Sequence, residues 1–281
     1  MILDPLRYPT YDQAAAIDIE TGLSTTTNEI YSDTVIENRL QQFKKHRLDE
    51  LKNTTLMNRV DTKFLLPRTY LRELLDKLQP FYSCLEIDSE NIFTYRNQYF
   101  DTANLLFYTQ HHNGKTNRYK VRQRHYIDTN SRFIEVKHKN NKKRTIKSRV
   151  RLSGLNTGKA EQLVQQKVGF SLSDLHVTQV GGYQRIALAN KEYRERLTLD
   201  INLWYQSPEN GSLVELPDIF IAELKQHKIN KHSPFFQIMS SSHFHPLRFS
   251  KYCIGCALLF GQTLKTNRFK PVLKSIQPML N

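Results

Sequence analysis

The sequence predicts an α+β protein built on an antiparallel β-barrel, with helices packed on the outside of the barrel. The first observation is a basic stretch, Arg118 to Arg151, which holds 13 Lys or Arg and only two acidic residues. The second is its spacing. Charges occupy alternate positions in three successive runs, Lys120-Arg122-Arg124, Glu135-Lys137-Lys139 and Lys147-Arg149-Arg151. Alternate residues of a strand share a face, so each run places its charges on one face of one strand.

The third observation is the order of elements along the chain. Strand patterns follow one another through short turns, with few helices between them, which favours an antiparallel sheet over βαβ units. Cationic faces laid side by side repel one another unless an anion lies between them. A closed barrel that is lined by these faces and leaves no open sheet edge satisfies this requirement.

Composition narrows the class of protein. The 281 residues include 41 Lys+Arg and 27 Asp+Glu, a net charge of +14. Such an excess indicates a polyanionic partner, either nucleic acid, an anionic membrane or phosphorylated compounds. We expect no transmembrane helix, because no run of 18 or more apolar residues is present. We expect no signal peptide, because the N-terminus has no basic segment followed by an apolar one. Three cysteines are too few for a disulfide framework and favour a reducing cytoplasm.

Three regions are expected along the chain: an N-terminal extension over residues 1–50, the barrel domain over 51–260 and a basic tail over 261–281. Residues 1–35 show no firm period. Helix-spaced apolar residues between Ser32 and Met57 predict an amphipathic helix that leads into the barrel. The tail carries four cations and is able to bind polyanions on its own account: Lys265, Arg268, Lys270 and Lys274.

The barrel domain begins with a strand over Met57–Leu66, in which Arg59, Asp61 and Lys63 share one face and Pro67 ends the run. A short helix over Thr69–Leu78 and an aromatic strand over 91–101 follow. After the basic strands, the patterns predict a helix within 153–170, a turn at Gly181-Gly182, strands over Arg194–Ile201 and Ile219–Lys225, and a helix over Ser233–Ser241.

An ordered set of motifs in these elements resembles the VTC domain, the polyphosphate polymerase of the vacuolar transporter chaperone complex. This family has the triphosphate tunnel fold and is related to the CYTH proteins. The resemblance runs from about Arg59 to Lys251. The motifs are Arg59-x-x-x-Lys63, Tyr99-Phe-Asp-Thr102, Arg122-x-Arg124, Glu135-Val-Lys137, Lys147-Ser-Arg149, Tyr183-x-Arg185, Arg196-Leu-Thr-Leu-Asp200, Glu223-Leu-Lys225 and Arg248-Phe-Ser-Lys251.

The resemblance implies a tunnel that binds ATP at one end and holds a growing inorganic polyphosphate chain. No specific nucleic acid is expected as partner, because a nucleic-acid binder would spread its cations over an outer surface with exposed aromatics, whereas these cations alternate along strands. It implies four catalytic residues, Lys63, Arg122, Arg124 and Lys137, and a nucleotide contact from Tyr183. Glu223 is implied as the protein ligand of a divalent ion, Mn²⁺ or Mg²⁺, which takes its other ligands from phosphate and water. The implied phosphate-binding residues are Arg59, Lys147, Arg149, Arg185, Arg196, Arg248, Ser250 and Lys251.

Two positions depart from the patterns of related branches. The triphosphatases of this fold carry Glu-x-Glu-x-Lys in the opening strand, where this chain has Arg59-Val-Asp61-Thr-Lys63. This difference favours polymerisation over metal-dependent hydrolysis. Lys139 stands where the eukaryotic family shows a His. Two alternatives stay open on sequence grounds: a metal-dependent tripolyphosphatase or nucleoside triphosphatase of the same fold, and a non-catalytic module that binds polyphosphate or another polyanion.

Several residues also have a structural interpretation. Glu223 suits an ion pair with a neighbouring cation as well as a metal ion. Glu135 and Asp200 are interpreted as internal counter-charges that position Arg and Lys side chains. Cys253 and Cys256 form an isolated CxxC, which we interpret as two buried cysteines, because no second ligand pair for zinc is in frame. The residues Lys142, Lys143 and Arg144 are expected in a solvated hairpin tip, and Tyr95, Tyr99, Phe100 and Tyr108 in the core.

Overall fold

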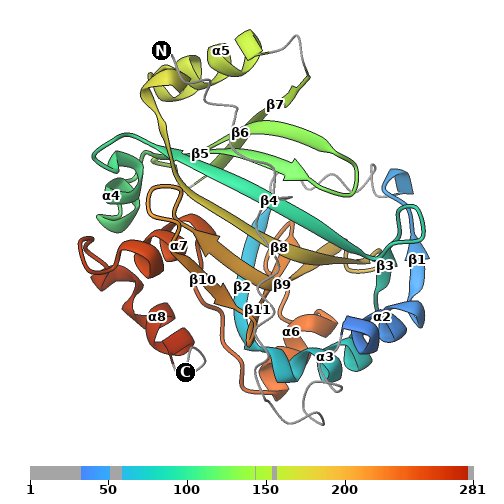
Figure 1. The fold of residues 1–281 in the computed structure, drawn as a ribbon. Coiled ribbons are helices and arrows are strands. Elements are labelled where there is room, and N and C mark those ends of the chain that lie inside the picture. Colours follow the sequence, from blue (N-terminus) through green and yellow to red (C-terminus); the bar gives the residue numbers. More distant parts are fainter. Residues whose placement is uncertain (1–32, 51–58, 143, 154–156, 278–281) are drawn as a thin grey trace.

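The computed structural model describes residues 33–50, 59–142, 144–153 and 157–277 (Figure 1). Eleven strands form one sheet: β1 (Lys44–His46), β2 (Val60–Pro67), β3 (Ser83–Leu85), β4 (Ile92–Asp101), β5 (Arg118–Tyr126), β6 (Ser131–Lys139), β7 (Thr145–Leu152), β8 (His176–Asn190), β9 (Glu195–Gln206), β10 (Leu213–Leu216) and β11 (Ile219–Gln226). The helices are α2 (Asp33–Gln41), α3 (Leu71–Leu78), α4 (Leu106–His112), α5 (Thr157–Val168), α6 (Pro234–Ser241), α7 (Lys251–Phe260) and α8 (Lys270–Ile276).

The main sheet is antiparallel, as predicted, and its strand order is β2-β11-β9-β8-β4-β5-β6-β7. A parallel pair, β1 with β3, extends it beside β8. Within the described residues β2 and β7 do not pair with each other, so the expectation of a closed barrel is corrected to a curled, open sheet. The two ends of the curl nevertheless face each other, because Lys63 of β2 and Lys120 of β5 donate to the adjacent residues Phe249 and Ser250 of one segment. The sheet therefore encloses a tunnel-like concave face.

The predicted alternation holds, because apolar residues of the strands lie on the convex face under helices. Phe64 and Leu66 of β2 pack with Leu71 and Leu75 of α3 in a buried cluster that α2 and α6 complete. On β5 and β6 a second convex cluster forms under α4 and α5: Phe107, Val121, Ile134, Val136, Ala160 and Val164. In Figure 1, α5 lies at the top and α2, α3 and α6 lie at the lower right. Burial of the convex face leaves the charged residues on the concave side.

Helix α7 differs from the other helices because it packs against the concave face. Its Ile254 lies in one apolar cluster with Tyr183, Leu203 and Tyr205 of the sheet. A Cβ on Gly255 would come within 2.3 Å of Gln179 Oε1, so only glycine allows this close packing. The predicted barrel with all helices outside is therefore corrected at α7, which covers the apolar part of one end of the concave face. Lys120 of β5 lies at the same end, because its Nζ donates to Ser250, the N-cap of α7.

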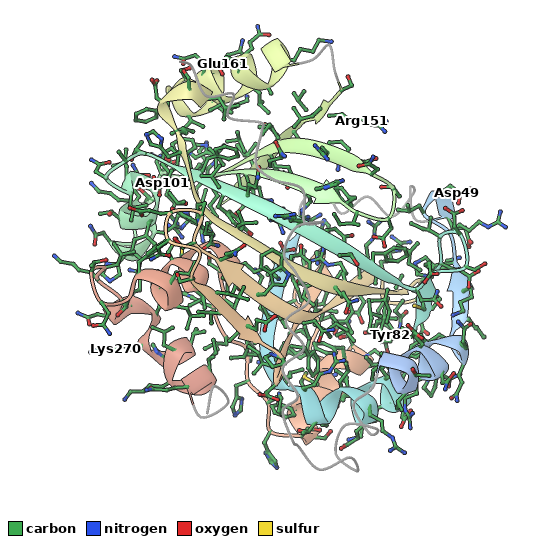
Figure 2. The ribbon with its side chains drawn as sticks, viewed as in Figure 1. Asp49, Tyr82, Asp101, Arg151, Glu161 and Lys270 are labelled. Carbon is green, nitrogen blue, oxygen red and sulfur yellow. The ribbon has the colours of Figure 1, made fainter. Side chains whose placement is uncertain are left out.

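Asp101 fixes the start of α4, a helix that the sequence patterns did not predict. Its carboxylate accepts hydrogen bonds from the backbone N–H groups of Phe107 and Tyr108, each at 2.8 Å, and one from the Tyr252 hydroxyl of α7. Figure 2 shows Asp101 beside α4. This buried carboxylate accordingly ties β4, α4 and α7 together, and the Tyr-Phe-Asp motif has a structural role.

The N-terminal helix is shorter than predicted. Helix α2 ends at Gln41, and the chain then turns into β1, which pairs with β3. Ile36 and Leu40 are buried, whereas Leu48 is 60% exposed and cannot belong to the apolar face of a longer helix. The prediction over Ser32–Met57 was thus wrong for residues 42–50. Its part from residue 51 on lies outside the described residues, as do residues 1–32 of the extension.

The predicted turn at Gly181-Gly182 was also wrong, since both glycines lie within β8. Trp204 and Tyr205 of the neighbouring β9 cover them. A Cβ on Gly182 would lie 2.4 Å from the Trp204 indole nitrogen. The glycines therefore serve close side-chain packing across two strands rather than a change of chain direction.

The C-terminal segment is ordered into α8, whose Val272 and Ile276 are buried against the apolar end of the concave face. No helix within the described residues is long and apolar enough to cross a membrane.

Candidate phosphate-binding site

Two buried carboxylates on the concave face each hold two cations. Glu135 on β6 accepts hydrogen bonds from Arg122 Nε and Nη2 at 2.8 and 2.6 Å, and Lys147 Nζ of β7 lies 2.5 Å from its other oxygen. Burial alone would raise the pKa of Glu135, but the positive charges of Arg122, Arg124 and Lys147 outweigh it and hold that pKa below its usual range. Glu135 is therefore an ionised counter-charge, as predicted.

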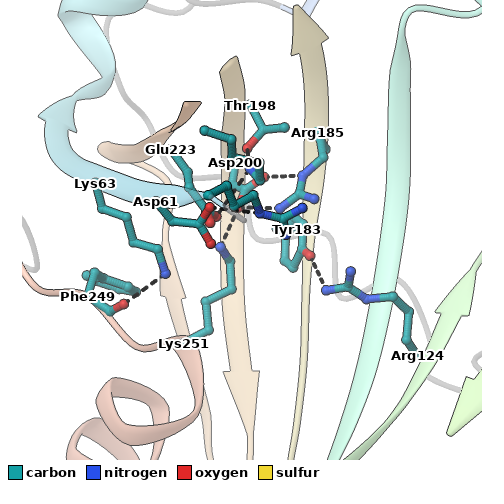
Figure 3. A network of polar contacts seen from close by, with 12 residues as sticks. Asp61, Lys63, Arg124, Tyr183, Arg185, Thr198, Asp200, Glu223, Phe249 and Lys251 are labelled. Atoms are coloured by element: carbon teal, nitrogen blue, oxygen red, sulfur yellow. Dashed lines mark hydrogen bonds and ion pairs between the residues drawn. The ribbon is translucent and has the colours of Figure 1, made fainter. Parts of the chain in front are cut away.

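Asp200 on β9 has the same arrangement, which Figure 3 shows. Arg185 of β8 binds both its oxygens, at 2.6 and 2.9 Å, and Lys251 at the start of α7 donates to one of them. Burial opposes ionisation of Asp200, but Arg185 and Lys251 hold its pKa below the usual range. The prediction that Asp200 is an internal counter-charge is confirmed.

A second group of cations has neutral partners instead of carboxylates. Lys63 Nζ donates to the Phe249 carbonyl at 3.1 Å, and Lys120 Nζ to the Ser250 hydroxyl at 2.7 Å. Arg124 donates through Nε to Asn97 Oδ1 at 3.1 Å and through Nη2 to the Tyr183 hydroxyl at 2.6 Å. These partners fix the side chains in place, and none of the three cations has a carboxylate at ion-pair distance among the described residues.

The segment that supplies two of these partners crosses the concave side. The Leu247 N–H donates to the Lys63 carbonyl of β2 at 2.8 Å. Three residues later Ser250 reaches Lys120 of β5 and also accepts from the Cys253 N–H as the N-cap of α7. This segment thus links the two walls of the curl at the start of α7.

Three lysines lie directly opposite one another on adjacent strands: Lys120 of β5, Lys137 of β6 and Lys147 of β7. Lys137 forms no hydrogen bond or ion pair with any described residue. The charge of Arg122 and burial lower its pKa well below the usual value. Burial likewise lowers the pKa values of Lys120 and Lys147 to about 8. Like charges in opposing positions destabilise a sheet, so this row favours a bound anion.

Glu223 of β11 is a carboxylate of the concave face that forms no ion pair with an arginine of the described residues. Lys225 Nζ lies 3.6 Å from it and also donates to the Thr198 hydroxyl at 3.1 Å. Burial would raise the pKa of Glu223, but Lys63, Lys225 and Arg185 hold it well below the usual value. No group of three or more His, Cys, Asp or Glu that could hold a metal ion occurs among the described residues. These residues therefore fit a metal ion that arrives with phosphate oxygens, and not one held by protein ligands alone.

Tyr183 is buried, at 3% exposure, in the wall of the site. Its ring stacks on Tyr95 at 5.2 Å between centroids, and Lys251 Nζ lies 4.4 Å from the ring centroid. The Tyr183 hydroxyl orients Arg124. A base could stack on this ring only if Tyr95 or Lys251 moved away.

The other predicted phosphate-binding residues lie around the margin. Arg59 is exposed and pairs with Asp61 at 3.0 Å, and its charge acts on Arg196 of β9. Arg149 is exposed, with its guanidinium 4.9 Å from the Phe133 ring centroid, and Arg248 is exposed in the segment that precedes α7. The predicted set thus divides into an interior group and these residues, whose role in phosphate binding stays a prediction.

Two lysines of the site were absent from the predicted set, Lys120 and Lys225. Both share strand parity with residues that were included, so the alternation itself was a sufficient signal for them. Asn97 and Thr198 gave no such signal, because neutral polar residues are common on any strand. Cys253 and Cys256 are buried free cysteines in α7, as predicted.

Comparison with known proteins gives one family match. The model of the VTC domain matches residues 58–260. No curated protein matches the chain.

Several solved structures are similar to the chain at low sequence identity. A candidate adenylate cyclase from Bacillus halodurans is 14% identical, with 69% of this chain and 96% of that chain covered and a TM-score of 0.46. A candidate adenylyl cyclase from Hippeastrum, described as having a dominant triphosphatase activity, is 12% identical over 71% of this chain and 95% of its own, with a TM-score of 0.46. The PH1819 protein from Pyrococcus horikoshii is 12% identical over 69% and 97%, with a TM-score of 0.40.

Proposed function

Because the chain belongs to the VTC domain family, we propose that it is a polyphosphate polymerase, which transfers the γ-phosphoryl group of ATP to a growing inorganic polyphosphate chain. The observation that carries the proposal is the set of interior cations without a carboxylate partner: Lys63, Lys120, Arg124 and Lys137. A protein gains nothing in stability from an excess of cations over carboxylates on one concave face. Their presence is explained by a ligand with many closely spaced negative charges.

The proposed reaction breaks one bond and forms one. A terminal oxygen of the polyphosphate chain attacks the γ-phosphorus, the bond from that phosphorus to the β–γ bridging oxygen breaks, and ADP leaves. Phosphoryl transfer needs alignment and charge neutralisation more than covalent assistance. No general base is required, because the attacking phosphate oxygen is already ionised.

The two groups of cations have different tasks in this proposal. Arg122 and Arg185, held by Glu135 and Asp200, keep fixed orientations and present their remaining N–H groups to phosphate oxygens. Lys137 and Lys63 supply charge at opposite walls of the curl, so a phosphoryl group between them is neutralised from both sides. Fixed donors of this kind stabilise the charge that spreads over the equatorial oxygens in the transition state.

We propose Glu223 as the protein ligand of a divalent ion, Mg²⁺ or Mn²⁺, that enters with the triphosphate. The ion would neutralise phosphate oxygens and orient the leaving group. Glu223 is suited because no described arginine forms a bidentate ion pair with its carboxylate. In the absence of phosphate the surrounding lysines disfavour a free cation at this position.

Residues 51–260 are proposed as the catalytic domain. The three cysteines are free and buried, which supports a reducing compartment such as the cytoplasm as the place of action.

The direct test incubates the purified protein with ATP and Mn²⁺ or Mg²⁺, resolves the products on a gel and measures ADP and free phosphate. Long polyphosphate with ADP is the expected result. Free phosphate without chains would instead indicate the triphosphatase, and neither product would indicate a binding module. Lys63→Ala and Arg122→Ala should each reduce turnover by at least about 10²-fold, whereas Arg72→Ala, an exposed substitution on α3, serves as the matched control. Retained turnover in both site variants would reject the assignment.

A further inference from the structure

The basic tail predicted from the sequence contributes one arginine to a cluster beside the concave face. Arg268 follows the family-matched region and lies in a single 3₁₀ turn that leads into α8. Its guanidinium packs over the loop between α4 and β5. Nη1 lies 3.4 Å from the His112 carbonyl, and a Cβ on Gly114 would come within 2.5 Å of that nitrogen. Gly114 has a φ of 71°, so both its backbone conformation and the close approach of Arg268 favour glycine at this position.

Arg118, the first residue of β5, is fastened to the same loop. Its Nη1 donates to the Lys115 carbonyl at 2.5 Å. Arg118 shares the concave face with Lys120, one alternate position further along the strand, about 7 Å by strand geometry. Its Nε is buried and has no hydrogen-bond partner. An unpaired buried donor of a charged group is costly, which points to an acceptor that binds there.

Arg248 completes the cluster from the segment before α7. After burial, the charges of Arg268 and Arg248 lower the pKa of Arg118, as expected for three guanidinium groups held close together. None of the three forms an ion pair with a carboxylate of the described residues. The backbone carbonyls of His112, the last residue of α4, and of Lys115 in the loop that follows anchor two of them, and carbonyls orient a guanidinium without cancelling its charge.

We propose that Arg118, Arg248 and Arg268 form an oxyanion site that binds phosphate groups of a polyphosphate chain beyond those held by the interior lysine row. The identity of the occupant as polyphosphate rests on the proposed function. The site continues the cationic column of β5, which runs through Arg124, Arg122, Lys120 and Arg118. Arg268 is exposed, so the site extends from this column to the solvent. A chain too short to reach past Lys120 would not contact these arginines.

The test compares binding of tripolyphosphate with binding of a long polyphosphate fraction by titration calorimetry, without ATP or metal. Arg268→Ala should weaken long polyphosphate about tenfold and leave tripolyphosphate unchanged, since one charge-assisted contact is lost. Arg118→Ala should act in the same direction. The salt dependence of long-chain binding should become shallower by about 0.7 in log–log slope for each arginine removed. Arg268→Lys should restore only part of the affinity, because lysine lacks the planar fork.

Arg72→Ala is the matched control, which removes one exposed arginine from α3 on the convex side. Long-chain affinity that is equal in Arg268→Ala and Arg72→Ala would overturn the inference. So would an equal loss for tripolyphosphate and long chains in Arg268→Ala. If long polyphosphate binding depends on the arginines but the protein makes no polyphosphate, the proposed polymerase is rejected and this site is not. If the protein makes polyphosphate but binding does not depend on the arginines, this site is rejected and the polymerase is not.

Discussion

The concave face contains two kinds of cation, and their anchoring separates them. Arg122, Lys147, Arg185 and Lys251 are bound to Glu135 or Asp200. Lys63, Lys120 and Arg124 are bound to neutral groups, and Lys137 to none of the described residues. Both kinds point to the same space. In the carboxylate-anchored group each carboxylate offsets part of the charge of its two cations, whereas the neutral-anchored group has no carboxylate at ion-pair distance among the described residues and is costly until an anion arrives.

The two groups indicate that the stability of the fold and the binding of ligand depend on different residues of one site. Ion pairs around two buried carboxylates make the wall stable and orient their arginines. The neutral-anchored cations supply the net charge that attracts a polyanion. Substitutions in the first group should therefore alter stability most, and substitutions in the second group should alter binding and turnover most.

The largest expected effect concerns the buried carboxylates. Asp200→Asn leaves Arg185 and Lys251 with a neutral partner, and removal of one member of a buried ion pair lowers the free energy of unfolding by about 3–5 kcal/mol. Urea denaturation of the ligand-free protein measures this loss. Asp61→Asn removes a more exposed carboxylate beside Arg59 and should cost at most about 1 kcal/mol. Equal losses of unfolding free energy in the two variants would contradict the distinction between the buried and the exposed carboxylates.

The next effect concerns the neutral-anchored cations. Lys63→Ala should reduce turnover by about 10²- to 10³-fold, the usual cost of losing one fixed donor to a transition state. Its free energy of unfolding should fall by less than that of Asp200→Asn, because Lys63 loses one hydrogen bond to the Phe249 carbonyl and its attraction to Glu223 but belongs to no buried ion pair among the described residues. Steady-state kinetics and urea denaturation on the same preparation give both values. Full activity with lowered stability would reverse the roles of the two groups.

The pH dependence of binding gives a third comparison. Burial lowers the pKa values of Lys120, Lys147 and Lys251 to about 8 in the free protein, and a bound polyanion raises them again. Polyphosphate affinity should consequently fall as pH rises above about 8, by up to about tenfold per pH unit for each lysine that must be protonated. Calorimetry in two buffers of different ionisation enthalpy should detect proton uptake near pH 8. Binding without proton uptake contradicts this linkage.

The smallest effect is expected at Ser250. Ser250→Ala removes the acceptor of Lys120 and the cap of the Cys253 N–H, at a cost of about 1 kcal/mol in stability. Lys120 keeps its charge, so turnover should fall only a few-fold. Ser250→Thr retains the hydroxyl and should behave like the unaltered protein in both thermal denaturation and kinetics. A loss as large as that of Lys63→Ala would show that Ser250 itself contacts the reacting phosphates.

Much of this arrangement was predictable from strand parity. The alternation of charges in β5, β6 and β7 placed Lys120, Arg122, Glu135, Lys137 and Lys147 on one face, because a strand leaves no other orientation. Counter-charge roles for Glu135 and Asp200 followed from a lone carboxylate among cations. The antiparallel order followed from short turns between strands.

What could not be predicted depends on contacts between distant segments. The partners of Lys63 and Lys120 lie in the segment before α7, and nothing in local spacing indicates that this segment crosses the sheet. Gly182 looked like a turn because its requirement comes from Trp204 on another strand. The sequence did not place the apolar segment that forms α7, because its apolar residues suit either face of the sheet equally well.

The most direct test of the central claim is Lys137→Met, measured for both polyphosphate affinity and unfolding of the ligand-free protein. Lys137 has no described hydrogen-bond or ion-pair partner and lies between Lys120 and Lys147. If it is reserved for phosphate, the variant should bind polyphosphate at least about tenfold more weakly. Its free energy of unfolding should stay equal or rise by up to about 1 kcal/mol, because like-charge repulsion is removed. Unchanged affinity together with lowered stability would contradict the account.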